Sequence, residues 1–153
     1  MAGSIEIESD GITIEQFILL LKSYLKIGKF HFFMALLVRD GVIHIGDIAL
    51  DPLDCEKTLL SLSAINGLWE VSVYSEYYGC QDVIAEIYIL SSLYNPNIEE
   101  VYLCDLLVDS GMVSISSGSE KNTIDVSIDG LYPVYGSLDE CGRLMSIRIQ
   151  LVS

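Results

Sequence analysis

The stretch DGLYPVYGSLDECGRLMSIRIQLV, residues 129–152, decides the fold class that this sequence predicts. It contains two turn signals, at Asp129-Gly130 and at residues 140–142, where Gly follows polar residues. The β-prone runs between and after these turns end in residues 144–152, which alternate apolar and polar side chains. Such alternation is typical of an antiparallel sheet with one buried face, so the stretch predicts strands that close the chain on a sheet.

The same period-two pattern recurs upstream. Residues 68–74 alternate Trp and Val with polar side chains, which is typical of a half-buried strand. The continuous apolar run 30–38 fits either a buried strand or a helix, and we expect a strand, with Arg39-Asp40-Gly41 as a hairpin turn and 42–45 as its return. Further strands are expected at residues 83–90, 101–108, 112–115 and 123–128.

Two helices are also expected. Residues 13–28 open with Thr13-Ile14-Glu15-Gln16, which has the form of a capping box, and continue with apolar residues at helical spacing. Residues 53–62 predict a second, short helix. The expected fold is therefore α+β, with a predominantly antiparallel β structure, sandwich-like or strongly curved, an N-terminal helix and a second short helix.

Length and composition predict one domain, residues 1–153. The chain has 153 residues, of which 51% are hydrophobic, so it can bury a substantial core. The sequence shows no internal repeat and no linker, and residues 116–122 are its most flexible loop, polar and rich in Ser.

Charge restricts the kinds of partner. The chain holds 22 acidic and 8 basic residues, which gives a net charge of −14, and the whole excess lies in residues 40–153. A strong negative charge repels nucleic acid and anionic membranes and speeds encounter with a basic protein. The alternative is that the acidic residues only keep the protein soluble. We therefore expect a basic protein partner, no direct contact with nucleic acid and no association with membranes.

The remaining signals predict a cytoplasmic protein without a cofactor. The N-terminal residues MAGSIEIESDG are acidic, whereas a signal peptide is basic and then apolar. The four cysteines lie far apart without metal-ligand spacing, so free thiols and no metal are expected. His31 and His44 would lie on neighbouring strands of the expected hairpin, but no third ligand is evident. No catalytic motif is recognised, so we do not expect an enzyme.

Tyrosines among carboxylates mark the expected partner-binding surface. Tyrosine offers a broad contact area with a polar tip and is enriched at binding hot spots, while acidic neighbours favour a basic partner. The segment YSEYYG, residues 74–79, places three tyrosines near the tip of an expected hairpin. The residues expected to bind the partner are Glu70, Tyr74, Glu76, Tyr77, Tyr78, Asp82 and Glu86.

A second candidate site, for a ligand or cation, is expected at the Gly-containing turns near residues 109 and 129. Asp109, Asp129 and Tyr132 each lie next to a Gly-containing turn, where they could converge on a ligand or cation. The structural alternative is that Asp before Gly makes a tight turn by accepting bonds from its own backbone.

Several segments together resemble a large family of bacterial domains of unknown function. The resemblance covers residues 42–152, and its most specific part is the block Gly130-Leu131-Tyr132-Pro133-Val134-Tyr135 followed by an Asp-x-x-Gly-Arg turn at 139–143. It implies a β-rich bacterial domain and no assigned chemistry. The Pro-Ser-Gly turn expected in the family is missing between Asp47 and Asp51.

The predicted function is a small acidic protein-binding module, an immunity or inhibitor protein that neutralises a basic partner such as a bacterial toxin. One alternative is a nucleic-acid mimic that inhibits a DNA-binding protein, which requires a contiguous acidic stripe. Another is a small metal-dependent hydrolase that uses Asp109 and Asp129. The sequence leaves open whether residues 30–38 are buried within the chain or against a second copy in a homodimer.

Overall fold

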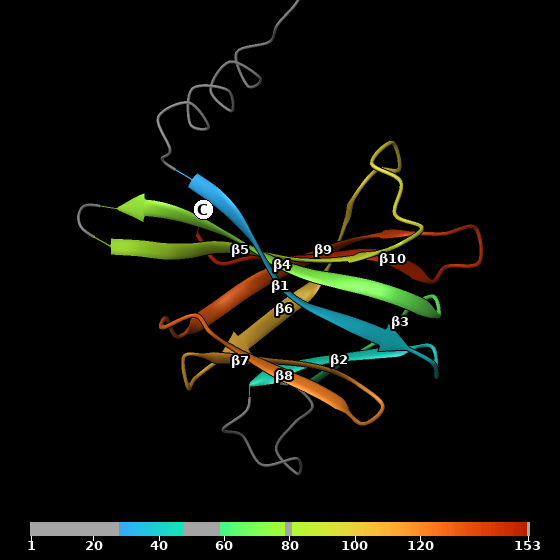
Figure 1. Ribbon diagram of the computed structural model, residues 1–153, viewed down its shortest axis with the longest axis horizontal. Helices are drawn as coiled ribbons and strands as arrows, with labels where there is room; N and C mark the ends of the chain where they lie inside the picture. The colour runs from blue at the N-terminus through green and yellow to red at the C-terminus, as the bar shows by residue number, and fades with distance from the viewer. Residues whose placement is uncertain (1–27, 48–58, 79–80, 153) are drawn as a thin grey trace, which may run out of the picture.

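The computed structural model describes residues 28–47, 59–78 and 81–152, and these residues form strands and the turns between them (Figure 1). The strands are β1 (Gly28–Val38), β2 (Val42–Asp47), β3 (Leu59–Ser63), β4 (Gly67–Tyr78), β5 (Gln81–Ser91), β6 (Val101–Val108), β7 (Met112–Ser117), β8 (Glu120–Asp125), β9 (Gly130–Leu138) and β10 (Leu144–Gln150).

The strands form two antiparallel sheets that pack face to face (Figure 1). The larger sheet has six strands in the order β1-β4-β5-β10-β9-β6, and the smaller has four in the order β3-β2-β7-β8. One hydrophobic cluster fills the space between them, with Leu36 and Trp69 from the larger sheet and Ile43 and Ile115 from the smaller. The architecture is a β-sandwich with a single core.

Alternation along the strands explains which face is buried. On β4, Trp69, Val71 and Val73 are buried, whereas Glu70 is exposed. The Trp69 indole N–H, which would be costly to bury without a partner, donates to the Ile65 carbonyl at 3.0 Å. The larger sheet therefore turns one face to the core and leaves the opposite one, which we call the outer face, away from the smaller sheet.

The α+β prediction is wrong, because the described part of the chain is all β. Residues 59–62, expected at the end of the second helix, belong to β3 and pair with β2, with Leu62 opposite Ile43. Ladder pairing with β2 outweighs the weak helical preference of a short apolar run. The rest of that helix, residues 53–58, lies outside the described residues. So does the expected N-terminal helix, except Gly28, which begins β1.

Residues 30–38 form a strand as predicted, but the expected hairpin with 42–45 is wrong. β1 pairs with β4 in the larger sheet, whereas β2 pairs with β3 and β7 in the smaller one. The turn at 39–41 leads the chain from the larger sheet to the smaller one. This crossing lets Val38 on β1 and Ile43 on β2 both bury their side chains in the core between the sheets. His31 and His44 consequently lie in different sheets rather than on neighbouring strands.

In the described ranges, the structure contains no helix that is long and apolar enough to cross a membrane.

Candidate functional site

The outer face of the larger sheet carries a row of side chains across all six strands, and five of the six are large. Residues that pair directly in an antiparallel ladder share a face, so the register identifies the members of the row. In strand order from β1 to β6, the row consists of Phe32, Ser72, Tyr88, Arg148, Tyr135 and Tyr102. A second row beside it consists of Phe30, Tyr74, Glu86 and Gln150.

Aromatic rings lie at both ends of this surface. The Phe30 ring lies 4.8 Å from the Tyr74 ring and 5.4 Å from the Tyr88 ring, between centroids, and both pairs are tilted. At the other end, the Tyr102 and Tyr135 centroids are 5.9 Å apart. Tilted pairs at these distances are favourable. Phe30 and Phe32 nevertheless remain 61% and 64% exposed, so the outer face offers apolar area that the described residues leave uncovered.

Arg148 lies at the centre of the face and connects its two aromatic ends. Its Nη1 donates to Glu86 Oε2 at 2.7 Å, and its Nη2 donates to Glu100 Oε1 at 2.6 Å. The guanidinium also stacks on the ring of Tyr135, with Cζ 4.5 Å from the centroid. A planar cation held by two carboxylates and a ring has little freedom, so Arg148 fixes the arrangement around it.

The same cluster shifts the ionisation of its members. Partial burial, then the charge of Glu86 and a hydrogen bond to that carboxylate, raise the pKa of Tyr88. The pKa of Arg148 is raised, first by its hydrogen bond to Glu100 and then by Glu86, against the effect of its own burial. Tyr88 is therefore a neutral donor and Arg148 a permanent cation throughout the physiological range.

The outer face has an acidic balance. Glu70, Glu86 and Asp105 lie on this face, because they pair with Ala35, Tyr74 and Pro133 on neighbouring strands at outward positions. Asp105 also accepts a hydrogen bond from Tyr102, which is the main reason that the pKa of Tyr102 is raised. Arg148 neutralises part of the charge of Glu86 and Glu100, and Glu70 is exposed.

The structure separates the expected partner-binding residues into two groups. Four of them, on β4 and β5, point to the outer face: Glu70, Tyr74, Glu76 and Glu86. Tyr77 and Asp82 pair with each other at inward positions of the ladder, so they lie on the opposite side of the sheet. Tyr78 pairs with Gln81 at the end of the hairpin, and its side chain is outside the described part.

The turns that carry Asp109 and Asp129 are neighbours in the structure. Val108 pairs with Gly130, so the two aspartates flank the same end of the β6–β9 ladder. The backbone N–H of Asp109 donates to the buried carboxylate of Asp47, which also accepts bonds from the N–H and hydroxyl of Ser110. These bonds anchor the β6–β7 turn.

Tyr132 has a structural contact of its own beside these turns. Its ring is buried, and its hydroxyl donates to the Ile128 carbonyl at 3.0 Å. Burial, and then the charge of Asp129, raise the pKa of the phenol. Within the described ranges, no group of three or more His, Cys, Asp or Glu side chains could hold a metal ion.

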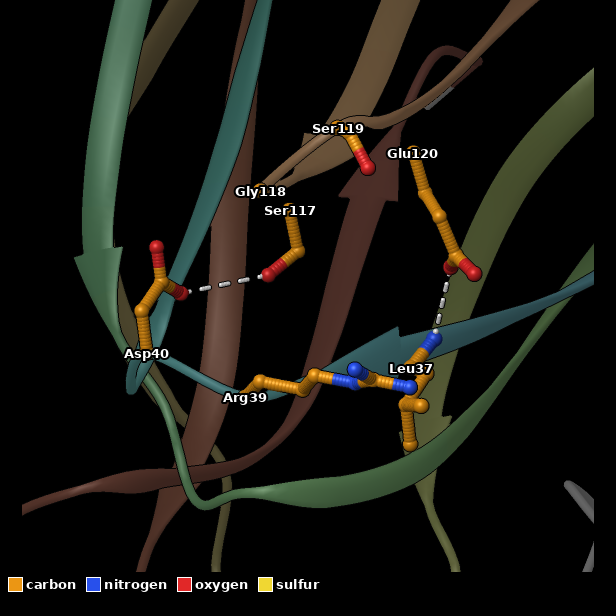
Figure 2. A pocket seen from close by; sticks show the side chains of 7 residues that line it. All are labelled: Leu37, Arg39, Asp40, Ser117, Gly118, Ser119 and Glu120. Carbon is orange, nitrogen blue, oxygen red and sulfur yellow. Dashed lines mark hydrogen bonds between the residues drawn. The ribbon is translucent and has the colours of Figure 1, made fainter.

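A polar pocket of about 240 Å³ lies where the β1–β2 turn meets the β7–β8 turn (Figure 2). Glu120 closes one side of it by accepting the backbone N–H of Leu37 at 2.9 Å. On the other side the Ser117 hydroxyl lies 3.4 Å from Asp40 Oδ1 and 2.7 Å from the Val42 carbonyl. These contacts connect β1 to the smaller sheet, which makes the pocket a junction of the two sheets.

Sequence reasoning did not select several residues that dominate the outer face. Phe30 and Phe32 lie in a continuous apolar run that predicts burial on both sides. No local pattern distinguishes Tyr102 and Tyr135 from the other tyrosines of this sequence. Arg148 carried a usable signal, because it lies on the polar side of an alternating strand in a region of strong acidic excess. Its two partners, Glu86 and Glu100, are too distant in sequence to be inferred from spacing.

Comparisons with protein families, with curated proteins and with solved structures find no match to this chain.

Proposed function

We propose that this chain is a protein-binding module and that the outer face of the larger sheet binds a basic protein partner. The observation that supports this function best is the combination of exposed phenylalanines with an ordered Arg148–carboxylate–tyrosine cluster on one face. Exposed aromatic anchors next to carboxylates are the components of an interface that combines apolar contact with charge complementarity. An immunity or inhibitor protein that neutralises a basic toxin is the role that we favour.

The charge of the whole chain supports the choice of partner. With a net charge of −14, the protein repels acidic proteins and attracts basic ones before contact. A location in the bacterial cytoplasm is part of the proposal. On the partner, we expect Lys or Arg side chains opposite Glu70, and apolar side chains opposite Phe30 and Phe32.

The outer face favours this role over nucleic-acid mimicry. A mimic presents carboxylates at regular spacing in place of phosphates, without neutralisation by its own cations. Here aromatic rings interrupt the carboxylates, and Arg148 binds two of them. The hydrolase alternative requires Asp109 and Asp129, and the hydrogen bonds described at their turns are structural. The Asp109 N–H donates to Asp47, and the Tyr132 hydroxyl donates to the Ile128 carbonyl, next to Asp129.

The decisive experiment is an affinity purification from the source organism with three matched baits. The baits are the unaltered chain, Glu70→Lys on the outer face, and Glu140→Lys in the exposed β9–β10 turn, which makes the same charge change away from that face. We expect one basic protein, retained at low salt and released at high salt, to bind the unaltered chain and Glu140→Lys but to be lost with Glu70→Lys. Equal capture by all three baits, or capture of no partner, would contradict the proposal.

If the captured partner is toxic, coexpression provides the functional test. The unaltered chain should restore growth to cells that produce the partner, and Glu70→Lys should protect them less.

A further inference from the structure

β1 is an edge strand with unusual properties for an exposed edge. The described sheets end in four edge strands: β1 and β6 in the larger sheet, β3 and β8 in the smaller. β6 and β8 contain carboxylates, and β3 has only 5 residues, whereas β1 has 11 residues and contains neither Asp nor Glu. Natural edges are usually short, charged or bulged, which hinders pairing with another chain; β1 is long, and its described protections are Lys29 at one end and the bulge at Phe33.

Only one end of this edge is closed within the described residues. Glu120 of β8 accepts the backbone N–H of Leu37, which covers the edge of β1 near its C-terminal end (Figure 2). Towards the N-terminal end, Phe30, Phe32 and Phe33 are all exposed. The available length of the edge therefore runs from Lys29 to Leu36.

We propose that β1 pairs antiparallel with β1 of a second copy, which joins the two larger sheets into one continuous sheet. A two-fold antiparallel arrangement makes the same strand edge complementary to itself. Charge favours a second copy at this position, because the chain has no acidic residue between Glu15 and Asp40 although its net charge is −14. Two copies that met through their acidic outer faces would repel each other.

The bulge in β1 determines the register. On either side of the bulge at Phe33, Phe30 and Ala35 lie on the outer face, whereas His31 and Met34 lie on the inner face. Directly opposite residues must share a face, so Phe30 of one copy faces Ala35 of the other, and His31 faces Met34. The two-fold axis then passes between Phe32 and Phe33, and the aromatic rings of the two copies meet at the centre.

The same register places opposite charges together at both ends. Lys29 of one copy lies opposite Leu36 of the other, next to the Leu37 N–H that holds Glu120. Lys29 pairs with Ser75 at an inward position, and Glu120 belongs to the smaller sheet, so both side chains lie on the inner side of the larger sheet. Two symmetric Lys29–Glu120 ion pairs therefore flank the paired β1 strands. The strand pairing ends at Leu37, because Glu120 already binds the N–H of that residue.

Sedimentation equilibrium over a concentration series tests this inference with the full chain alone, so its result does not depend on the proposed function. We expect a mass of twice 16.9 kDa, falling towards 16.9 kDa on dilution. Lys29→Glu and Glu120→Lys should each raise the dissociation constant about tenfold, and the double variant should recover most of the affinity because it reverses both charges. Lys121→Glu, the neighbouring exposed position, should leave the dissociation constant unchanged.

A second pair of variants tests the centre of the interface. Phe32→Lys should give a monomer, and Leu93→Lys, an equally exposed apolar side chain in the β5–β6 loop, should remain a dimer. Circular dichroism should show unchanged β structure in every variant. A mass of 16.9 kDa at all concentrations, or a dimer that Lys29→Glu and Phe32→Lys leave intact, would overturn the inference.

Discussion

The guanidinium carbon of Arg148 lies 4.5 Å from the centre of the Tyr135 ring on the adjacent strand. The same guanidinium binds Glu86 on the other neighbouring strand and Glu100 before β6. One side chain thereby connects three separate parts of the larger sheet. This arrangement leads to the first of four predictions.

Arg148→Ala should lower the free energy of unfolding by roughly 2 kcal/mol, because it leaves the partly buried Glu86 and the more exposed Glu100 without their cation. Urea denaturation measures the change. Arg143→Ala is the matched control: its ion pair with Asp139 lies at the surface, with the Arg143 side chain 50% exposed, and should contribute less than about 1 kcal/mol. Equal losses in the two variants would show that the central position of Arg148 has no energetic consequence.

Tyr88 should make stability fall in alkaline solution. Its pKa is raised above the ordinary value of 10.0 by burial and by Glu86, so above about pH 10 the unfolded chain loses the phenolic proton more readily than the folded one. The stability that this group contributes is complete below the unfolded pKa and is lost as pH rises towards the folded pKa. Denaturation across this window should show a shallower decline for Tyr88→Phe. An identical decline in both proteins would contradict the assignment.

Asp47→Asn should destabilise the β6–β7 turn. The buried Asp47 carboxylate accepts bonds from the Asp109 N–H and from both the N–H and the hydroxyl of Ser110, and an amide cannot replace two acceptor oxygens. We expect a loss of roughly 2 kcal/mol in urea denaturation and faster amide exchange in the turn. Asp105→Asn, at an exposed position of β6, serves as the control and should change stability little. Unchanged exchange in Asp47→Asn would contradict the anchoring role.

Tyr132→Phe should cost about 1 kcal/mol, because it removes the hydroxyl that donates to the Ile128 carbonyl and keeps the buried ring. Thermal and urea denaturation provide the measurement, with Tyr94→Phe as the control at an exposed tyrosine. Under our proposal Tyr132→Phe retains full affinity for the protein partner. A loss of affinity for the partner without a loss of stability would instead support a binding role for the Asp109 and Asp129 turns.

The candidate site could be predicted in part. Carboxylates and tyrosines on β4 and β5 suggested a binding surface, and Glu70, Tyr74, Glu76 and Glu86 do lie on one face. Tyr77 and Asp82 lie near the same hairpin tip, so the sequence predicts them on the same surface. Strand alternation directs these two to the opposite side, which composition alone does not reveal.

Local pattern determined the strands of this protein. The period-two alternation in β4 and β10 specified which residues extend and which side chains the core receives, because burying one face of a sheet favours that pattern. The apolar run of β1 predicted a strand but not which of its side chains lie in the core. The tertiary structure decided the rest: the pairing of residues 59–62 as β3, the division of β1 and β2 between two sheets, and the meeting of Arg148 with Glu86 and Glu100. These features depend on contacts between residues far apart in the chain, and no local preference encodes which distant strand will lie alongside.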